Sequence, residues 1–269
     1  MKRILFAILL AVVGVTSAKA QGANRIVSLA PSLTKNVYYL ESQSKLVGCT
    51  SYCQVAITDG KEVVATAVKV NIEKVISLKP DLVIATTITN PETIAMLKKY
   101  GVRVEVFPTA KSFDEICQQF LRLGKIIGAN DAAKRVVDTA TNRVKEIVAM
   151  HEGKAAPRIF FQIGAKPLFT VIPNTFMNDY ITLAGGVNVV TETKRGTISR
   201  EAVIALNPDI IFVVTMGIVG DEEKKVWEGY TTLNASKNKQ IYIIDSDKAS
   251  TPTPVTFVET LEAIVGLIK

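Results

Sequence analysis

Two glutamates, Glu73 and Glu201, occupy the same place in a segment that the chain contains twice. The first copy runs from Asn71 to Ala85 and the second from Ser199 to Val213, with Glu, Val, Ile, Leu, Pro and Asp at matching positions. Equivalent carboxylates on two similar units could form ion pairs with a partner that also has two equivalent faces. Such pairs set register and specificity more than affinity.

The same two glutamates also have a purely structural interpretation. Asn71 and Ser199 are good helix N-caps, so each glutamate falls in a first helical turn, where the helix dipole favours an acid. Each copy is therefore typical of a capped short helix, a Pro-Asp turn and a buried strand. The symmetry of the two copies weakens this structural interpretation, but the residues alone leave both interpretations open.

Catalytic and metal-binding chemistry have little support in the sequence. His151 is the only histidine, and it follows a long helical pattern, so a Ser-His-Asp arrangement has no base. The chain also lacks a Gly-x-Ser-x-Gly elbow and a phosphate-binding Gly-x-x-x-x-Gly-Lys loop. A zinc or manganese site needs several converging His, Cys or carboxylate ligands. We therefore predict no enzyme, no catalytic residue and no metal site.

The elements that position the repeated segments follow an α/β pattern. Short apolar runs alternate with helical patterns, which is typical of βα units with parallel sheets. In the first half we predict strands at 25–29, 46–48, 82–85 and 103–107, and helices at 33–40, 72–78 and 91–99. In the second half we predict strands at 158–162, 168–171, 210–214 and 241–244, and helices at 175–184, 200–206 and 256–267. Together with the repeat, this pattern predicts two similar lobes.

A long helical region separates the two halves. Residues 112–153 are mostly helical with a break at 128–130, and Asp131 to His151 forms one amphipathic pattern. A flexible linker would be rich in Gly, Ser or Pro, so this connector is predicted to be stiff and to allow little closure of the lobes. The predicted boundaries are 24–127 for the N-terminal lobe, 128–155 for the connecting helix and 156–269 for the C-terminal lobe.

The first twenty residues have the order of a secretory signal peptide. Lys2-Arg3, an apolar run and Ala18-Lys19-Ala20 follow one another, which predicts cleavage after Ala20. No cysteine lies near that site, so we expect no lipid anchor and a periplasmic protein. The apolar run is short for a membrane span, and nothing later in the chain resembles one.

Charge and cysteine content set further limits. The formal net charge of +7 falls to +4 without the three basic residues of the first twenty, a mild excess that does not indicate nucleic-acid binding. Cys49, Cys53 and Cys117 are an odd number, which argues against a disulfide framework. Cys49 and Cys53 are close enough in sequence for a disulfide, but buried thiols are the default interpretation.

Several segments, in order along the mature chain, resemble the periplasmic substrate-binding proteins of cobalamin and iron-complex ABC importers. They lie at 25–32, 47–52 and 71–85 in the first half, and at 158–170, 184–188 and 198–201 in the second half. The resemblance implies two Rossmann-like α/β lobes joined by a single long rigid helix, with a ligand cleft between them. It also implies a receptor that is a monomer when free and delivers a small molecule to a permease dimer. Family members carry a docking glutamate on each lobe, and Glu73 and Glu201 stand at those positions.

The resemblance also implies a ligand site, with a corrinoid such as cobalamin as the expected ligand. Tyr52 and Phe169 match aromatic positions that pack on a corrin ring; ordinary core packing is the alternative for both. Where the cobalamin binders place tryptophans, this chain has Ala67-Val68-Lys69, Thr86-Thr87 and Arg195-Gly196-Thr197, with no tryptophan in any of them. Trp227 either lines the cleft rim or closes a helix onto the second lobe. Arg195 and Lys248 could meet acidic groups of a ligand.

The missing tryptophans leave other ligands open. Haem or a ferric siderophore suits the same scaffold, because small residues at those positions make room and basic residues could meet propionates or siderophore acids. A non-transport sensor domain of the cell envelope that borrows the fold is a further alternative.

Overall fold

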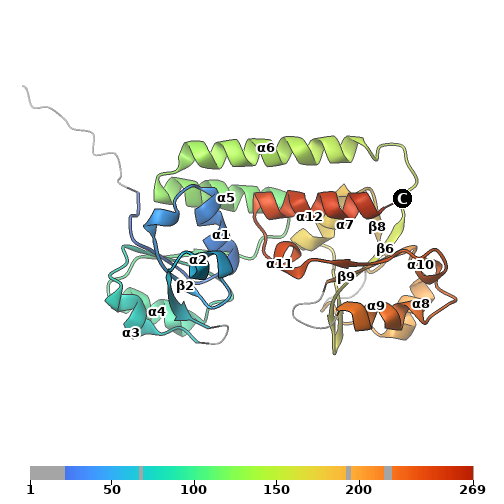
Figure 1. Ribbon diagram of the computed structural model, residues 1–269, viewed down its shortest axis with the longest axis horizontal. Helices are drawn as coiled ribbons and strands as arrows, with labels where there is room; N and C mark the ends of the chain where they lie inside the picture. The colour runs from blue at the N-terminus through green and yellow to red at the C-terminus, as the bar shows by residue number, and fades with distance from the viewer. Residues whose placement is uncertain (1–21, 67–68, 192–194, 215–219, 269) are drawn as a thin grey trace, which may run out of the picture.

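The computed structural model describes residues 22–66, 69–191, 195–214 and 220–268 of the chain. The predicted signal peptide lies outside these residues. Two α/β lobes stand side by side beneath a layer of long helices (Figure 1). No helix within the described ranges is long and apolar enough to cross a membrane.

The N-terminal lobe is a parallel sheet in the order β3-β2-β1-β4-β5. Its strands are β1 (Ile26–Ser28), β2 (Leu46–Thr50), β3 (Glu62–Ala65), β4 (Leu82–Thr86) and β5 (Val104–Phe107). Its helices are α1 (Pro31–Tyr39), α2 (Gln54–Thr58), α3 (Ile72–Ser77) and α4 (Pro91–Lys99), with a 3-10 turn at Gln43–Lys45. Apolar clusters fill both faces of the sheet, as expected for strands covered by helices on both sides.

The C-terminal lobe is built around β6 (Arg158–Ala165), which pairs in parallel with β9 (Ile210–Val214) and antiparallel with β7 (Leu168–Thr170). β10 (Ile241–Ile244) extends the sheet beyond β9, and β8 (Val187–Asn188) pairs with the start of β6. Its helices are α7 (Phe176–Leu183), α8 (Arg200–Leu206), α9 (Gly220–Glu228), α10 (Asn234–Lys237), α11 (Ser246–Ala249) and α12 (Pro254–Leu267).

The repeated segment forms the same substructure in both lobes. Asp81 accepts a hydrogen bond from the backbone of Arg25 at 3.1 Å, and Asp209 accepts one from the backbone of Arg158 at 3.0 Å. Each arginine also donates from its guanidinium to the carbonyl of the last residue of the repeat's helical stretch, Leu78 or Leu206. The Pro-Asp turn therefore ties its helix to the start of the neighbouring strand. The Pro-Asp turn of the repeat therefore has a structural role.

The connector is stiff, and it has two helices. α6 (Asn130–Ala149) packs Ala133 against the N-terminal core and Val144 against the C-terminal core. α5 (Phe113–Ile127) does the same, because Phe113 packs in the C-terminal core while Phe120 packs in the N-terminal core. α6 is thus the single helix that carries the chain onward between the lobes, and α5 lies beside it and reinforces it (Figure 1).

Most predicted elements match the observed ones within two or three residues. The strands at 210–214 and 241–244 and the helices at 91–99 and 200–206 have the predicted bounds. β3, β8, α2, α9, α10 and α11 were not predicted. All of these except α9 have five residues or fewer, so they give little hydrophobic periodicity in the sequence. Helix α9 is as long as α4, but most of its residues are charged, so it also lacks an apolar pattern.

Candidate functional site

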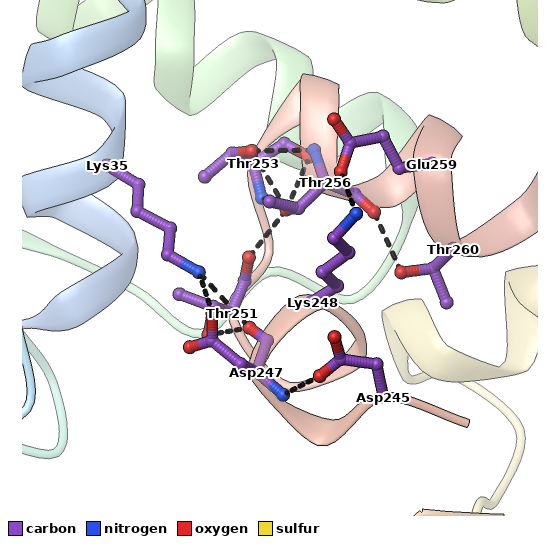
Figure 2. Close-up of polar contacts among 9 residues, drawn as sticks. All are labelled: Lys35, Asp245, Asp247, Lys248, Thr251, Thr253, Thr256, Glu259 and Thr260. Atoms are coloured by element: carbon purple, nitrogen blue, oxygen red, sulfur yellow. Dashed lines mark hydrogen bonds and ion pairs between the residues drawn. The ribbon is translucent and has the colours of Figure 1, made fainter. Parts of the chain in front are cut away.

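The carboxyl edges of the two sheets face each other. Lys35 lies on α1, which follows the end of β1, and Asp247 lies on α11, which follows the end of β10. The Lys35 ammonium contacts the Asp247 carboxylate at 2.8 Å and so joins the two lobes (Figure 2). Ligands of open α/β sheets bind at the carboxyl ends of the strands. The space between these two edges is therefore the candidate ligand cleft.

A network of threonines fixes α11 against α12. Thr253 and Thr256 form a reciprocal capping box at the start of α12, and Thr256 also donates to the Thr251 carbonyl at 2.7 Å (Figure 2). Thr251 in turn donates to the Asp247 carbonyl. Each donor hydroxyl that leads to Asp247 belongs to a β-branched threonine with a restricted χ1, and each acceptor is a backbone carbonyl, so these bonds constrain the turn that carries Asp247.

The Lys35–Asp247 ion pair is expected to contribute little to stability. The Asp247 side chain is 72% exposed, so Asp247→Asn should lower the free energy of unfolding by less than about 1 kcal/mol. Urea unfolding at low and high salt measures this effect. Asp138→Asn, which breaks the exposed Lys134–Asp138 pair within α6, is the matched control. A loss of several kcal/mol specific to Asp247→Asn would contradict this account of the inter-lobe contact.

Lys248 was predicted to meet acidic ligand groups, and it already has a partner. Its ammonium contacts Glu259 of α12 at 2.9 Å (Figure 2). The hydrogen bond and the charge of Glu259 raise the pKa of Lys248. A ligand acid would have to compete with this carboxylate.

On the N-terminal lobe, the carboxyl edge carries the predicted residues Tyr52 and Thr86. Tyr52 follows β2 and is 61% exposed, which excludes the alternative that it is a core residue. Thr86 ends β4 and is half-buried. The loop after β4 adds Ile88, whose side chain is 83% exposed. Sequence reasoning missed Ile88 because a single isoleucine in a threonine-rich loop gives no periodic signal.

On the C-terminal lobe, three predicted residues lie together. Phe169 of β7 is 38% exposed and forms an isolated β-bridge with Thr197. The next residue, Thr170, donates from its backbone to the Gly196 carbonyl at 2.8 Å. Gly196 has a φ of 72°, a conformation that favours glycine, and a Cβ there would approach the Thr170 carbonyl. This turn places the exposed Arg195 close to Phe169 in the chain's fold.

The prediction that Trp227 lines the cleft rim is corrected. Its side chain is fully buried in the C-terminal core, against Phe160. Its indole Nε1 donates to Gln162 Oε1 at 2.6 Å. Because no part of the ring is accessible, Trp227 closes α9 onto the sheet and does not contact a ligand directly.

Cys49 and Cys53 are free, buried thiols in the core of the N-terminal lobe. Their mutual hydrogen bond lowers the pKa of Cys53 and raises the pKa of Cys49. The hydroxyl oxygens of Thr34 and Thr50 lie 3.1 Å and 3.2 Å from the Cys53 sulfur, and these hydrogen bonds also lower the pKa of Cys53. The pair therefore packs within the N-terminal core.

Glu73 and Glu201 project from the first turns of α3 and α8, as predicted. Asn71 accepts from the Lys74 backbone at 2.9 Å, and Ser199 accepts from the Ala202 backbone at 3.2 Å. Both glutamates are exposed, and neither has an ion-pair partner among the described residues. Helix α3 and helix α8 both lie on the side of their lobe away from α6 (Figure 1).

The groups around Glu201 stabilise its ionised form. Backbone and Ser199 hydrogen bonds, followed by Arg200, lower its pKa. The carboxylate therefore stays ionised to a lower pH than an ordinary glutamate.

Two cavities lie outside the space between the sheet edges. A groove of about 370 Å³ runs between α6 and α12 and is lined largely by apolar side chains, among them Val136 and Val258. A polar cavity of about 510 Å³ lies between the start of α5 and α7. Neither cavity contains a predicted ligand or docking residue.

The fold and the facing edges agree with the comparison to known protein families. The pattern of the family described as periplasmic binding protein matches residues 26–248. The chain belongs to this family. A relative, the vitamin B12-binding protein of Vibrio cholerae, is 28% identical over 256 residues, covering 94% of this chain and 91% of the relative.

Solved structures of the periplasmic binding protein family share the two-lobed architecture. A possible iron-binding periplasmic solute-binding protein from Staphylococcus epidermidis is 28% identical, with a TM-score of 0.81 and coverage of 92% of this chain and 99% of that protein. The periplasmic vitamin B12 binding protein of Vibrio cholerae is 26% identical, with a TM-score of 0.77 and coverage of 91% and 96%.

Membership of the periplasmic binding protein family defines the general role. The chain is a periplasmic substrate-binding protein of an ABC importer, with a small-molecule ligand and a membrane permease as partners. It is a transport receptor and not an enzyme.

Proposed function

We propose that this receptor captures a corrinoid between its lobes and delivers it to the permease. The observation that carries the proposal is an exposed aromatic side chain at the carboxyl edge of each sheet, Tyr52 on one lobe and Phe169 on the other. Aromatic faces on both sides suit a large, flat and partly apolar ligand. The vitamin B12-binding relative supports the same ligand class.

The remaining contacts follow from the two edges. Ile88 adds apolar area at the same edge of the sheet as Tyr52, and Thr86 and Gly196 leave room where larger side chains would narrow the cleft. Arg195 supplies a positive charge at the rim for polar groups of the ligand. Lys248 contributes only if the ligand displaces it from Glu259. Affinity then comes mainly from apolar and aromatic burial.

The second candidate ligand is an iron complex, either haem or a ferric siderophore. The Staphylococcus epidermidis relative favours it, and Arg195 suits propionates or siderophore acids. Titration calorimetry with cyanocobalamin, cobinamide, haemin and a ferric siderophore separates the candidates. The corrinoid proposal predicts heat with the first two at micromolar concentration. Heat with haemin or the siderophore alone would overturn it in favour of the iron complex.

The exposed aromatic residues give a direct prediction for the cleft. Tyr52→Ala and Phe169→Ala should each weaken ligand binding about tenfold while leaving the free energy of unfolding nearly unchanged, because both side chains are exposed in the free protein. Calorimetry and urea unfolding measure the two effects.

Tyr100→Ala is the matched control for Tyr52→Ala. Tyr100 is 62% exposed but follows the end of α4, at the amino edge of the sheet. It should leave ligand affinity unchanged. If Tyr52→Ala and Phe169→Ala bind as tightly as the wild type, the aromatic walls are not the ligand site.

Delivery in this proposal depends on Glu73 and Glu201. They are exposed, equivalent in fold position, and free of ion-pair partners among the described residues, so they are available to arginines or lysines of a permease dimer.

We also propose that residues 1–20 are a cleaved leader without a lipid anchor. The mature receptor then consists of lobes at 24–127 and 156–269 with the connecting helix at 128–155, and it is a monomer when free.

A further inference from the structure

A closed ring of four side chains lies behind the docking helix α8. Arg200 Nη2 contacts Glu223 Oε2 at 2.6 Å, and the same carboxylate oxygen accepts from Gln162 Nε2 at 2.8 Å. Gln162 Oε1 accepts from Trp227 Nε1 at 2.6 Å. The Arg200 guanidinium carbon then lies 4.8 Å from the centre of the Trp227 ring and completes the ring.

This ring is largely removed from water. Gln162 and Trp227 are fully buried, and the Arg200 and Glu223 side chains are 23% and 10% exposed. A charge pair in such surroundings is screened far less than a surface pair, and loss of one partner leaves an uncompensated buried charge. The stacked, planar guanidinium also has one defined orientation, which a lysine could not reproduce.

Arg200 is placed where this anchor acts on Glu201. It is the first residue of α8, between the cap Ser199 and Glu201. A helix of seven residues has little stability of its own, so the direction of its first turn depends on contacts with the rest of the lobe. Through Gln162, which also donates to the Gly164 carbonyl, the same ring reaches the strand that pairs with β7 and its Phe169.

In the N-terminal lobe, the equivalent helix α3 is held by an apolar side chain and not by a charged one. Ile72 stands at the place of Arg200 in the repeated segment, and it packs on the apolar cluster that contains Val75. The docking helices therefore match in their glutamates but differ in their anchors. The substitution Arg200→Ile, which gives α8 the residue that α3 has at this place, therefore tests the role of Arg200.

We propose that Arg200, held by Glu223 and Trp227, is the positioning residue that orients Glu201 for contact with the permease. This inference rests on the proposed docking role of the glutamates. An anchored first turn loses less conformational freedom on docking, so the contact gains affinity without an additional contact to the partner.

The test is a double-mutant cycle of Arg200→Ile and Glu201→Ala. Binding of the cyanocobalamin-loaded and ligand-free receptor to the cognate permease–ATPase complex in lipid nanodiscs is measured by surface plasmon resonance. Arg200→Ile alone should weaken docking about tenfold, and it should add little in the Glu201→Ala background. Ligand affinity should be unchanged in both. A purely structural role would instead weaken docking equally in both backgrounds.

A second variant keeps the test valid if Arg200→Ile destabilises the lobe. Arg200→Ile combined with Glu223→Gln removes the uncompensated carboxylate while still releasing the first turn of α8. Arg135→Ile, which removes an exposed arginine of α6, is the control and should dock as the wild type.

The outcomes distinguish the positioning role of Arg200 from the docking role of Glu201 on which it rests. If Glu201→Ala weakens docking but the Arg200 variants do not, the positioning role is overturned and the docking role stands. If Arg200→Ile weakens docking to the same extent with and without Glu201, the positioning role is also overturned. If Glu201→Ala docks as the wild type, the docking proposal itself fails.

Discussion

Substituting both Glu73 and Glu201 with alanine is expected to reduce receptor-dependent ligand uptake at least about tenfold, with no change in ligand affinity. The two carboxylates are exposed on the first turns of α3 and α8, on the side of each lobe away from α6 (Figure 1). Neither glutamate belongs to the proposed ligand contacts Tyr52 and Phe169. Their loss removes ion pairs with the permease and leaves the ligand contacts intact.

The single variants should be intermediate, because each lobe contributes one contact. Transport by proteoliposomes that contain the permease–ATPase complex measures uptake, and calorimetry measures ligand affinity. Asp131→Ala is the matched control, since Asp131 is an exposed first-turn acid on α6, on the opposite side of the molecule. Uptake by the double variant at the wild-type rate would remove the docking role of the two glutamates.

Trp227→Ala is expected to lower the free energy of unfolding by about 3–5 kcal/mol. The indole is the largest fully buried side chain, and it packs edge-on against Phe160 at a centroid distance of 5.6 Å. Its removal leaves a cavity and an unpaired Gln162 oxygen, and it also takes away the surface on which Arg200 stacks.

Urea unfolding followed by circular dichroism measures this loss, because the variant lacks the only tryptophan and with it the fluorescence signal. Trp227→Phe should cost less, since it keeps part of the volume but not the Nε1 donor. Phe169→Ala is the contrasting control and should have little effect on stability. If Trp227→Ala is as stable as the wild type but binds ligand poorly, Trp227 belongs to the cleft and its placement here is mistaken.

The sequence predicted the scaffold well where the physical signal is local. The repeated caps, Pro-Asp turns and apolar strands indicated the α3–β4 and α8–β9 units, and the helical pattern at 131–151 indicated the connector. The repeat did not indicate that Arg25 and Arg158 donate hydrogen bonds to it. These arginines lie 53 and 48 positions away in the sequence from the carbonyls to which they donate, so the contact is visible only in the fold.

The site was harder to predict for a similar reason. Exposure distinguishes Tyr52 from Trp227, and exposure depends on which face of the fold a segment covers. Lys248 looked free in sequence, but α12 brings Glu259 to it. The ring around Arg200 joins residues up to 65 positions apart, so no spacing rule connects them. Residues 67–68, within a stretch where the family's cobalamin binders place a tryptophan, lie outside the described structure.

We propose that this protein captures a corrinoid and that the importer receives the corrinoid from this protein. The most direct measurement is ATP-driven accumulation of labelled cyanocobalamin by proteoliposomes that contain the cognate permease–ATPase complex, with and without the wild-type receptor. Uptake should require the receptor and should saturate as the receptor concentration rises. Equal uptake with and without the receptor, or no uptake in its presence, would contradict this proposal.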